Sequence, residues 1–385
     1  MNRIYLDHNA TTRPDPVVRE EMFSCLDNAF GNPSSLHAFG QEARRIVDRS
    51  RNRAAKLISA APDEIIFTSG GTESNNQALY GIAESLGKHK RHIITTAIEH
   101  HALLHPCAYL ERRGFEVTYL PVDENGLVDP QDLIRALRED TSLVSVMLAN
   151  NEVGTIQPLT EIAAIAKDRG VLTHTDAAQT VGKIPVNVEE LGIDLLSFSG
   201  HKFYGPKGIG ALYVRRGTPL QPILYGGHQE RVLRAGTENV PAIAGFGKAC
   251  ELAEMRLDRY DKLIRSLRDR FEYAVLKQID GAHINGHPTL RLSNTSNIGF
   301  EGADGEMLAI NLDLAGVAVS TGAACSSADR EPSHVLLAMG RKPEEALASV
   351  RFSFGMENAS DEVDQIVDLL RDTLGSLRLN KANTG

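Results

Sequence analysis

Lys202 stands among glycines and small polar residues in the stretch "SFSGHKFYGPKGIG", which begins at the end of the apolar run "IDLLSF". A lysine at the end of a buried strand loses hydration, which lowers its pKa and leaves part of its amine unprotonated. Such an amine can attack a carbonyl carbon and form a Schiff base. The structural alternative is a solvated lysine in a glycine-rich loop, and Lys207 beside Pro206 fits that description better.

A carboxylate follows another predicted strand. Asp176 lies at the end of an apolar run within "THTDAAQTVG". Burial of a carboxylate costs free energy unless it meets a cation or hydrogen-bond donors. The structural alternative is an N-cap, because residues compatible with a helix follow. The functional interpretation is a partner for a positive group on a ligand, at a strand end near that of Lys202.

The stretch "FTSGGTESNN" is typical of an anion site. A predicted strand ends, two glycines turn the chain, and Thr72 opens a helix whose first N–H groups have no partner within the helix. The stretch is neither a Walker P-loop nor G-x-G-x-x-G. A tight strand–helix turn capped by Thr72 is the structural alternative.

Histidines follow a further strand in "AIEHHALLH". His100 comes directly after the strand and could point into a cleft. His101 and His105 are four residues apart, but a zinc protease of the H-E-x-x-H type needs a glutamate that is missing here. Surface residues are the structural alternative, and we expect no stable metal site.

Taken together, the four stretches favour a cofactor site. A phosphate cradle, a stacking imidazole, an acid for a pyridinium nitrogen and a lysine for an aldehyde are what pyridoxal 5'-phosphate requires. The sequence therefore predicts that Lys202 carries this cofactor.

The elements that position these residues alternate between strand and helix, which predicts an α/β fold with a mainly parallel sheet flanked by helices. Ligands of such sheets lie at the carboxyl ends of the strands. The predicted strands are residues 64–68, 92–96, 116–120, 143–148, 171–175, 195–199 and 211–214, and helices are predicted at 74–85, 130–138 and 161–168.

The length of 385 residues suits a large domain and a smaller one. We expect one long helix or two over residues 239–276, connecting the two. The large domain is predicted to span 15–256, and a smaller α+β domain to comprise 1–14 plus 257–385. In the smaller domain, strands are expected at 293–300 and 317–320, and helices at 305–314 and 361–377.

Composition excludes several classes of protein. The net charge of −9 gives no sign of a basic face for nucleic acid. The N-terminus has no apolar segment typical of a signal peptide, and no apolar run is long enough to span a membrane. The irregular spacing of the cysteines argues against disulfides and structural zinc. We therefore expect a cytoplasmic protein with reduced thiols.

Motifs along nearly the whole chain resemble those of the NifS/IscS-like cysteine desulfurases, which are fold-type I pyridoxal-phosphate enzymes. Besides the stretches above, the motifs that carry the resemblance are "YLDHNATT", "GNPSSLHAFG", "NNEVGTIQP", "RAGTENV" and "STGAACSSADREPSHVL". The resemblance implies a fold with a seven-stranded sheet and a smaller α+β domain.

The resemblance also implies a role for each matching residue. Lys202 would form the Schiff base, Asp176 would pair with the pyridine nitrogen, and Gln179 would bond the phenolic oxygen. His100 would stack on the ring and act in catalysis. Asn151, beside it, would contact both the cofactor and the substrate. Arg351 would bind the substrate carboxylate, for which its planar fork is suited. The phosphate would be held by Gly71, Thr72, Ser199 and His201, and by Thr237 of the other subunit of a homodimer.

Cys325 would be the nucleophile that takes sulfur from L-cysteine and releases L-alanine. It lies in a run of small and polar residues, which predicts a loop at about 321–333. A buried structural cysteine would have larger apolar neighbours. Cys25, Cys107 and Cys250 lie in helical patterns and are expected to be inert packing residues.

The implied partner is an iron–sulfur scaffold or another sulfur-acceptor protein that receives the persulfide from Cys325. Selenocysteine lyases share much of the scaffold, so selenocysteine is the alternative substrate. From other classes, a cofactor-free scaffold protein that kept the fold and a zinc hydrolase using His101 and His105 remain alternatives.

Overall fold

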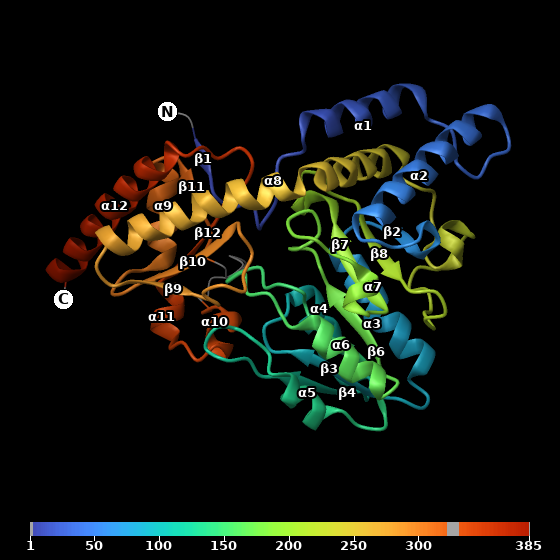
Figure 1. The fold of residues 1–385 in the computed structure, drawn as a ribbon, viewed down its shortest axis with the longest axis horizontal. Coiled ribbons are helices and arrows are strands. Elements are labelled where there is room, and N and C mark those ends of the chain that lie inside the picture. Colours follow the sequence, from blue (N-terminus) through green and yellow to red (C-terminus); the bar gives the residue numbers. More distant parts are fainter. Residues whose placement is uncertain (1–2, 322–330, 385) are drawn as a thin grey trace.

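A seven-stranded sheet forms the centre of the larger part of the molecule (Figure 1). The computed structural model describes residues 3–321 and 331–384. In spatial order the strands are β2 (Ile65–Thr68), β8 (Gly210–Val214), β7 (Leu195–Ser199), β6 (Leu172–Asp176), β5 (Thr141–Ser145), β3 (His92–Thr96) and β4 (Glu116–Leu120). Strands β7, β6, β5, β3 and β4 run parallel, whereas β8 is antiparallel to both of its neighbours. The predicted mainly parallel sheet is confirmed.

Helices cover both faces of this sheet (Figure 1). They are α2 (Ala38–Leu57), α3 (Gly71–Leu86), α4 (His101–Arg112), α5 (Pro130–Ala136), α6 (Leu159–Asp168) and α7 (Val188–Leu191), with α1 (Pro16–Asn28) outside them. Successive strand residues point to opposite faces. Ile65 and Phe67 accordingly belong to the apolar core that includes α2, and Ile66 to the separate core that includes α3. Burial on both faces explains why these strands read as continuous apolar runs.

The long helix α8 (Val240–Gln278) runs from one part of the molecule to the other (Figure 1). It begins at Asn239, whose side chain accepts a hydrogen bond from the Ala242 backbone N–H. Its first half packs into the core of the large sheet, and its second half, from Tyr260 onward, packs into a separate apolar core. The predicted connecting helix is thus one continuous helix.

The second core surrounds a three-stranded antiparallel sheet. Its strands are β12 (Ser349–Ser353), β10 (Thr295–Phe300) and β9 (Ala282–Asn285), and the helices beside it are α9 (Gly305–Leu314) and α12 (Glu362–Thr384). The N-terminal strand β1 (Ile4–Tyr5) pairs with β11 (Val317–Ala318), so the first residues of the chain pack with its last quarter. The short helices α10 (His334–Ala338) and α11 (Pro343–Leu347) instead pack in a small cluster with Ile98, Met147 and Val153 of the larger part.

Most predicted strands are found within two residues of their expected bounds, but four details differ. Helix α12 ends at Thr384, seven residues later than expected. Strand β5 ends at Ser145 rather than at 148, because its last ladder pair is the one between Ser145 and His174 of β6. Helix α3 begins at Gly71 and its N-cap is Gly70, so Thr72 lies inside the first turn and does not cap it. Helix α5 ends at Ala136, two residues earlier than expected. Within the described ranges, none of the helices is long and apolar enough to cross a membrane.

Candidate active site

Lys202 lies just past the end of β7, in a short 3-10 turn (Gly200–Lys202). Its Nζ donates hydrogen bonds to the backbone carbonyl oxygens of Asn9 (2.6 Å) and Ala10 (2.9 Å). Burial, together with the positive charge of Arg351, lowers the pKa of this amine to about 8. About a tenth of the amine is therefore unprotonated at pH 7, and this form can make the nucleophilic attack.

A cavity of about 210 Å³ opens in front of this amine. It brings together nine of the residues that the sequence singles out: Gly71, Thr72, His100, Asn151, Asp176, Gln179, Ser199, His201 and Lys202. They come from the carboxyl ends of β7 and β6, the loop after β5, the start of α3 and the start of α4. Parallel strands deliver these residues to one edge of the sheet, where ligands of such folds bind.

Asp176 ends β6 and faces this cavity with 8% of its surface exposed. The Asn75 side chain donates to its Oδ2 (2.6 Å), and the Ala178 backbone N–H donates to its Oδ1 (2.9 Å). A turn follows Asp176 rather than a helix, so the N-cap interpretation is wrong. The two donors fix the carboxylate, and its remaining lone pairs can accept a proton-bearing ring nitrogen.

The start of α3 forms the anion side of the cavity. Gly70 precedes it with φ 154° and ψ −177°, a conformation that only glycine adopts readily. No side chain caps this helix start, and the N–H groups of its first turn have no acceptor within the helix. The side chains of Ser199 and His201 line the same cavity. These donors are suited to a phosphate group.

His100 is the N-cap of α4, and its Nδ1 accepts a hydrogen bond from the Ala102 backbone N–H (3.0 Å). Burial lowers the pKa of His100, and the charge of Lys202 lowers it further. The ring is therefore neutral with its proton on Nε2. A neutral ring with one N–H donor can stack on a flat ligand and can move a proton.

His101 and His105 stack with ring centroids 4.9 Å apart, and the ring of His334 lies 4.9 Å from that of His101. These histidines do not form a metal-binding site with a further carboxylate or cysteine among the described residues. Within residues 3–321 and 331–384, no group of three or more potential ligands is arranged to hold a metal ion.

Arg351 lies in β12 and is 5% exposed. One of its terminal nitrogens donates to the Asp7 carboxylate (2.7 Å), and the other donates to the Asn151 backbone oxygen (3.1 Å). Its Nε is buried with no hydrogen-bond partner among the described residues. Arg351 does not line the cavity itself, but its charge reaches Lys202 and its guanidinium has a donor to spare.

Besides Arg351, one further described residue of the predicted site, Thr237, does not line the cavity. Thr237 lines a different hollow of about 270 Å³, together with Thr68 and Ser69. Cys325 lies outside the described residues. The other cysteines are buried, and burial raises the pKa of each thiol, which agrees with inert packing: Cys25, Cys107 and Cys250.

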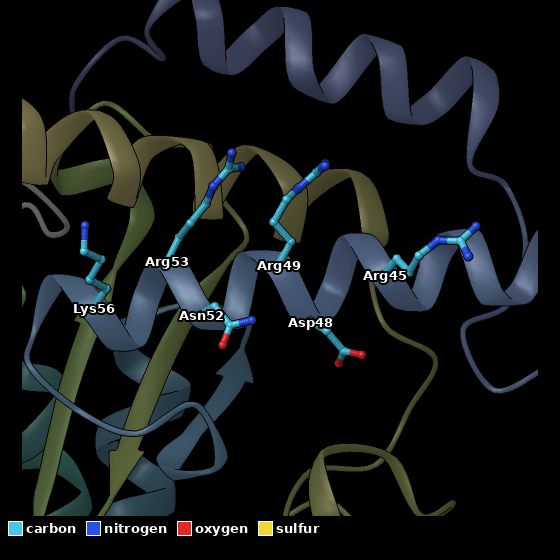
Figure 2. A pocket seen from close by; sticks show the side chains of 6 residues that line it. All are labelled: Arg45, Asp48, Arg49, Asn52, Arg53 and Lys56. Carbon is cyan, nitrogen blue, oxygen red and sulfur yellow. The ribbon is translucent and has the colours of Figure 1, made fainter.

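A larger hollow of about 440 Å³ lies along α2 and is lined by six residues of that helix (Figure 2). Its four cations are Arg45, Arg49, Arg53 and Lys56, and each is paired with a carboxylate. Such exposed pairs leave little positive charge for an anion. The start of α3 is therefore the better phosphate site.

Three residues that sequence reasoning missed hold the site together. Asn75 orients Asp176, as described above. Asn9 accepts the Lys202 amine, and Lys183 donates to the side-chain oxygens of Gln179 (2.9 Å) and Asn9 (3.0 Å). Asn75 and Asn9 lie within stretches that the sequence singled out and Lys183 directly follows one, but only the tertiary contacts give them a role.

The residues around the cavity fit pyridoxal phosphate. The unpartnered N–H groups of α3 match its phosphate, the buried carboxylate of Asp176 matches its ring nitrogen, and the Lys202 amine matches its aldehyde. His100 offers a neutral ring at the same cavity. Arg351 lies just outside the cavity with its terminal nitrogens bonded to Asp7 and Asn151, so a substrate carboxylate would bind its guanidinium by replacing one of these contacts.

Comparison with known proteins agrees with this chemistry. The class-V aminotransferase family profile matches residues 4–366. Over 375 residues the chain is 52% identical to a Dictyoglomus turgidum protein described as cysteine desulfurase IscS, covering 97% of this chain and 95% of the relative. A solved NifS-like protein superposes with a TM-score of 0.92 at 42% identity, covering 97% of this chain and all of that one. Another, SspA in complex with cysteine, gives a TM-score of 0.82 at 36% identity, covering 91% and 98%.

Proposed function

Because this chain belongs to the class-V aminotransferase family, we propose how its residues build a pyridoxal-phosphate-dependent cysteine desulfurase. The proposal depends most on one observation: the Lys202 amine with its lowered pKa and the Asp176 carboxylate line the same cavity. When bound, pyridoxal phosphate supplies an electron sink for the bonds at the α-carbon of an amino acid. The residues of the chain bind it, orient the substrate and move protons.

Lys202 is the residue that holds the cofactor and later moves a proton at the α-carbon of L-cysteine. Its pKa of about 8 supports this role, because a general base works best when its pKa is near the working pH. Asp176 keeps the ring nitrogen protonated. His100 and Asn151 lie against the ring, and Gln179 donates to its phenolic oxygen.

The phosphate is held by Gly71, Thr72, Ser199 and His201. We assign the substrate carboxylate to Arg351, whose unpartnered Nε and planar guanidinium support that role. The Asp7 pair keeps this guanidinium oriented while the substrate is absent.

Cys325 is the proposed sulfur acceptor. Its thiolate attacks the sulfur of the substrate, so an S–S bond forms while the C–S bond breaks. The electron pair of that bond stays on the carbon fragment, which takes up a proton and leaves as L-alanine. The persulfide then remains on the enzyme, and no external oxidant or reductant is needed.

The anchoring of both flanks of the Cys325 stretch supports this assignment. Before the stretch, Ser320 exchanges backbone hydrogen bonds with Arg351 (2.6 and 3.2 Å). After it, the His334 ring bonds the Glu99 backbone oxygen (2.9 Å), next to His100. Both ends are therefore tied beside proposed substrate and cofactor residues.

A homodimer is the proposed assembly. Five apolar side chains are exposed on α1, in the turn after it and at the start of α2, and we call them the α1–α2 patch: Phe23, Leu26, Phe30, Leu36 and Phe39. The rings of Phe30 and Phe39 lie beside each other in this patch. Leu36 is 93% exposed and Phe30 is 73% exposed, and patches of this kind are typical of interfaces. Thr237 would complete the phosphate site of the other subunit.

We further propose that the persulfide passes to an iron–sulfur scaffold or another sulfur-acceptor protein, in the cytoplasm. The largest apolar core on each side supports a division into a large domain, 15–256, and a small one, 1–14 plus 257–385, although a smaller cluster around Met147 and Leu336 crosses this boundary.

The visible absorbance of the purified protein tests this function. Protein with pyridoxal phosphate is expected to show the band of a lysine-bound cofactor, and L-cysteine is expected to change that band while L-alanine forms. Lys202→Ala is expected to lose the band. A colourless protein that the cofactor cannot reconstitute would contradict the proposal.

A further inference from the structure

Lys183 is a buried lysine that the chemistry above does not use. It is 2% exposed and follows Gln179 by four residues in the sequence. Its Nζ donates to two side-chain amide oxygens, Oε1 of Gln179 (2.9 Å) and Oδ1 of Asn9 (3.0 Å). Burial holds its pKa well below the usual range, and the charges of Lys202 and Arg351 lower that pKa further. An amine buried between two neutral acceptors suggests a role that depends on hydrogen bonding rather than on charge pairing.

The hydrogen bonds of Gln179 define which end of its amide faces which way. Its Nε2 donates to the backbone oxygen of Asn9 (3.0 Å), and a carbonyl oxygen can only accept. Its Oε1 accepts from Lys183. With Oε1 held by Lys183, the second N–H of the amide is the donor that remains for a ligand in the cavity that Gln179 lines.

Asn9 extends the same constraint to Lys202. Its backbone oxygen accepts from both Lys202 and Gln179, and its Oδ1 accepts from Lys183 and from Asn294 (2.8 Å). Its own Nδ2 donates to the Asn151 backbone oxygen (3.0 Å). Lys183 therefore bonds both Asn9 and Gln179, and these two residues are linked to the Lys202 amine through the Asn9 backbone oxygen.

We propose that Lys183 is a positioning residue that holds the Gln179 oxygen away from the cavity, so that Gln179 presents an N–H donor to the phenolic oxygen of pyridoxal phosphate. The inference rests on the proposed function. An N–H donated to that oxygen stabilises its ionised form and makes it a poorer acceptor for the proton on the adjacent nitrogen. Lys183 therefore lowers the pH at which the visible band of the bound cofactor changes.

Lys183→Met tests this role, because methionine keeps the length of the side chain and removes both donated hydrogen bonds. The Gln179 oxygen then lacks a buried partner and turns toward the polar cavity. We expect the pH midpoint of the visible band to rise by about one unit. Cofactor affinity of the apoprotein is expected to fall about tenfold, the effect of one hydrogen bond. A purely structural role would change the thermal midpoint of the apoprotein but not the pH midpoint of the band.

Two further variants assign the effect to its cause. Gln179→Ala is expected to raise the same midpoint, and Lys183→Met in that background is expected to add no further shift. Lys207→Met is the matched control, because it removes an exposed lysine near His201 without touching Gln179. Its midpoint is expected to equal that of the wild type. If Lys183→Met does not fold, Lys183→Leu is used with the same expectation.

The outcomes separate this inference from the proposed function. A shift in Gln179→Ala with none in Lys183→Met would overturn the role of Lys183 and leave the proposed function intact. Additive shifts in the double variant would also overturn it. A band that survives Lys202→Ala would instead contradict the proposed function itself.

Discussion

The Lys202 amine lies 2.6 Å from the backbone oxygen of Asn9, so residues 193 apart in the sequence meet at the reactive nitrogen. A second carbonyl, that of Ala10, accepts from the same amine at 2.9 Å. The N-terminal segment thus holds the lysine at the cavity. Both partners of the amine are carbonyl oxygens rather than a carboxylate. Burial can therefore lower its pKa, while the amine still faces the cavity.

The lowered pKa of Lys202 predicts a pH-dependent stability of the apoprotein. A lysine whose pKa falls from its usual 10.5 to about 8 on folding binds fewer protons in the folded state. The burial of its charged form lowers the free energy of unfolding. This penalty is complete below pH 8 and disappears as the pH rises toward 10.5. We expect the free energy of unfolding of Lys202→Met apoprotein to be about 1–2 kcal/mol higher than that of the wild type at pH 7.

Denaturant unfolding at pH 7 and pH 10 measures this difference. The difference between variant and wild type is expected to shrink at the higher pH. Lys207 is an exposed lysine of the same loop, so Lys207→Met is the control. Its free energy of unfolding is expected to match that of the wild type at both pH values. A difference that does not depend on pH would contradict the lowered pKa.

Asp176→Asn is expected to lower kcat by at least about 100-fold, because an amide cannot stabilise a protonated ring nitrogen as a carboxylate does. The fold should persist, since the amide oxygen can still accept from Asn75 or from the Ala178 N–H. Alanine formation measures kcat, and thermal unfolding checks the fold. Asp168→Asn, an exposed carboxylate at the end of α6, serves as the control. Wild-type kcat in Asp176→Asn would rule out its assignment.

Arg351→Lys is expected to raise KM for L-cysteine by about tenfold to 100-fold and to change kcat much less. Lysine keeps the charge but loses the planar fork that binds a carboxylate at two points. Initial rates over a range of L-cysteine concentrations separate the two constants. An unchanged KM would show that the substrate carboxylate binds elsewhere.

Phe30→Asp is expected to dissociate the dimer, because it places a charge in the centre of the α1–α2 patch. Light scattering after size-exclusion chromatography gives the mass directly. The protein is expected to be a dimer and the variant a monomer with weaker cofactor affinity, because Thr237 of the other subunit would be lost. Tyr273→Asp is the control, an exposed aromatic residue on the distant half of α8. A wild-type monomer would contradict the proposed assembly.

The sequence alone predicts the strands that carry the chemistry. The bounds of β3 (His92–Thr96) and β7 (Leu195–Ser199) agree residue by residue, because buried parallel strands appear as short apolar runs that end in polar residues. The convergence of Lys202, Asp176 and the start of α3 follows from that sheet. Helix α2 is not among the predicted elements. Its many arginines conceal an apolar face, which is visible only from the spacing of buried residues such as Ala43, Val47 and Ala54.

The supporting contacts could not be predicted in the same way. Asn9 bonds Gln179 and Lys183 across about 170 residues, and Asp7 bonds Arg351 across 344. No local pattern encodes such pairs, since they depend on how the N-terminal segment crosses between the two sheets. The start of α3 was misplaced for a different reason. A glycine with an unusual conformation, rather than a capping side chain, begins that helix.

The transfer of sulfur to Cys325 is the central claim, and one measurement tests it most directly. Alanine formation from L-cysteine is followed in the wild type and in Cys325→Ala, both loaded with pyridoxal phosphate, while visible absorbance reports the bound cofactor. We predict that the variant keeps the cofactor band and loses alanine formation by at least about 100-fold. Alanine formation at the wild-type rate in Cys325→Ala would contradict the account, because sulfur would then leave by another route.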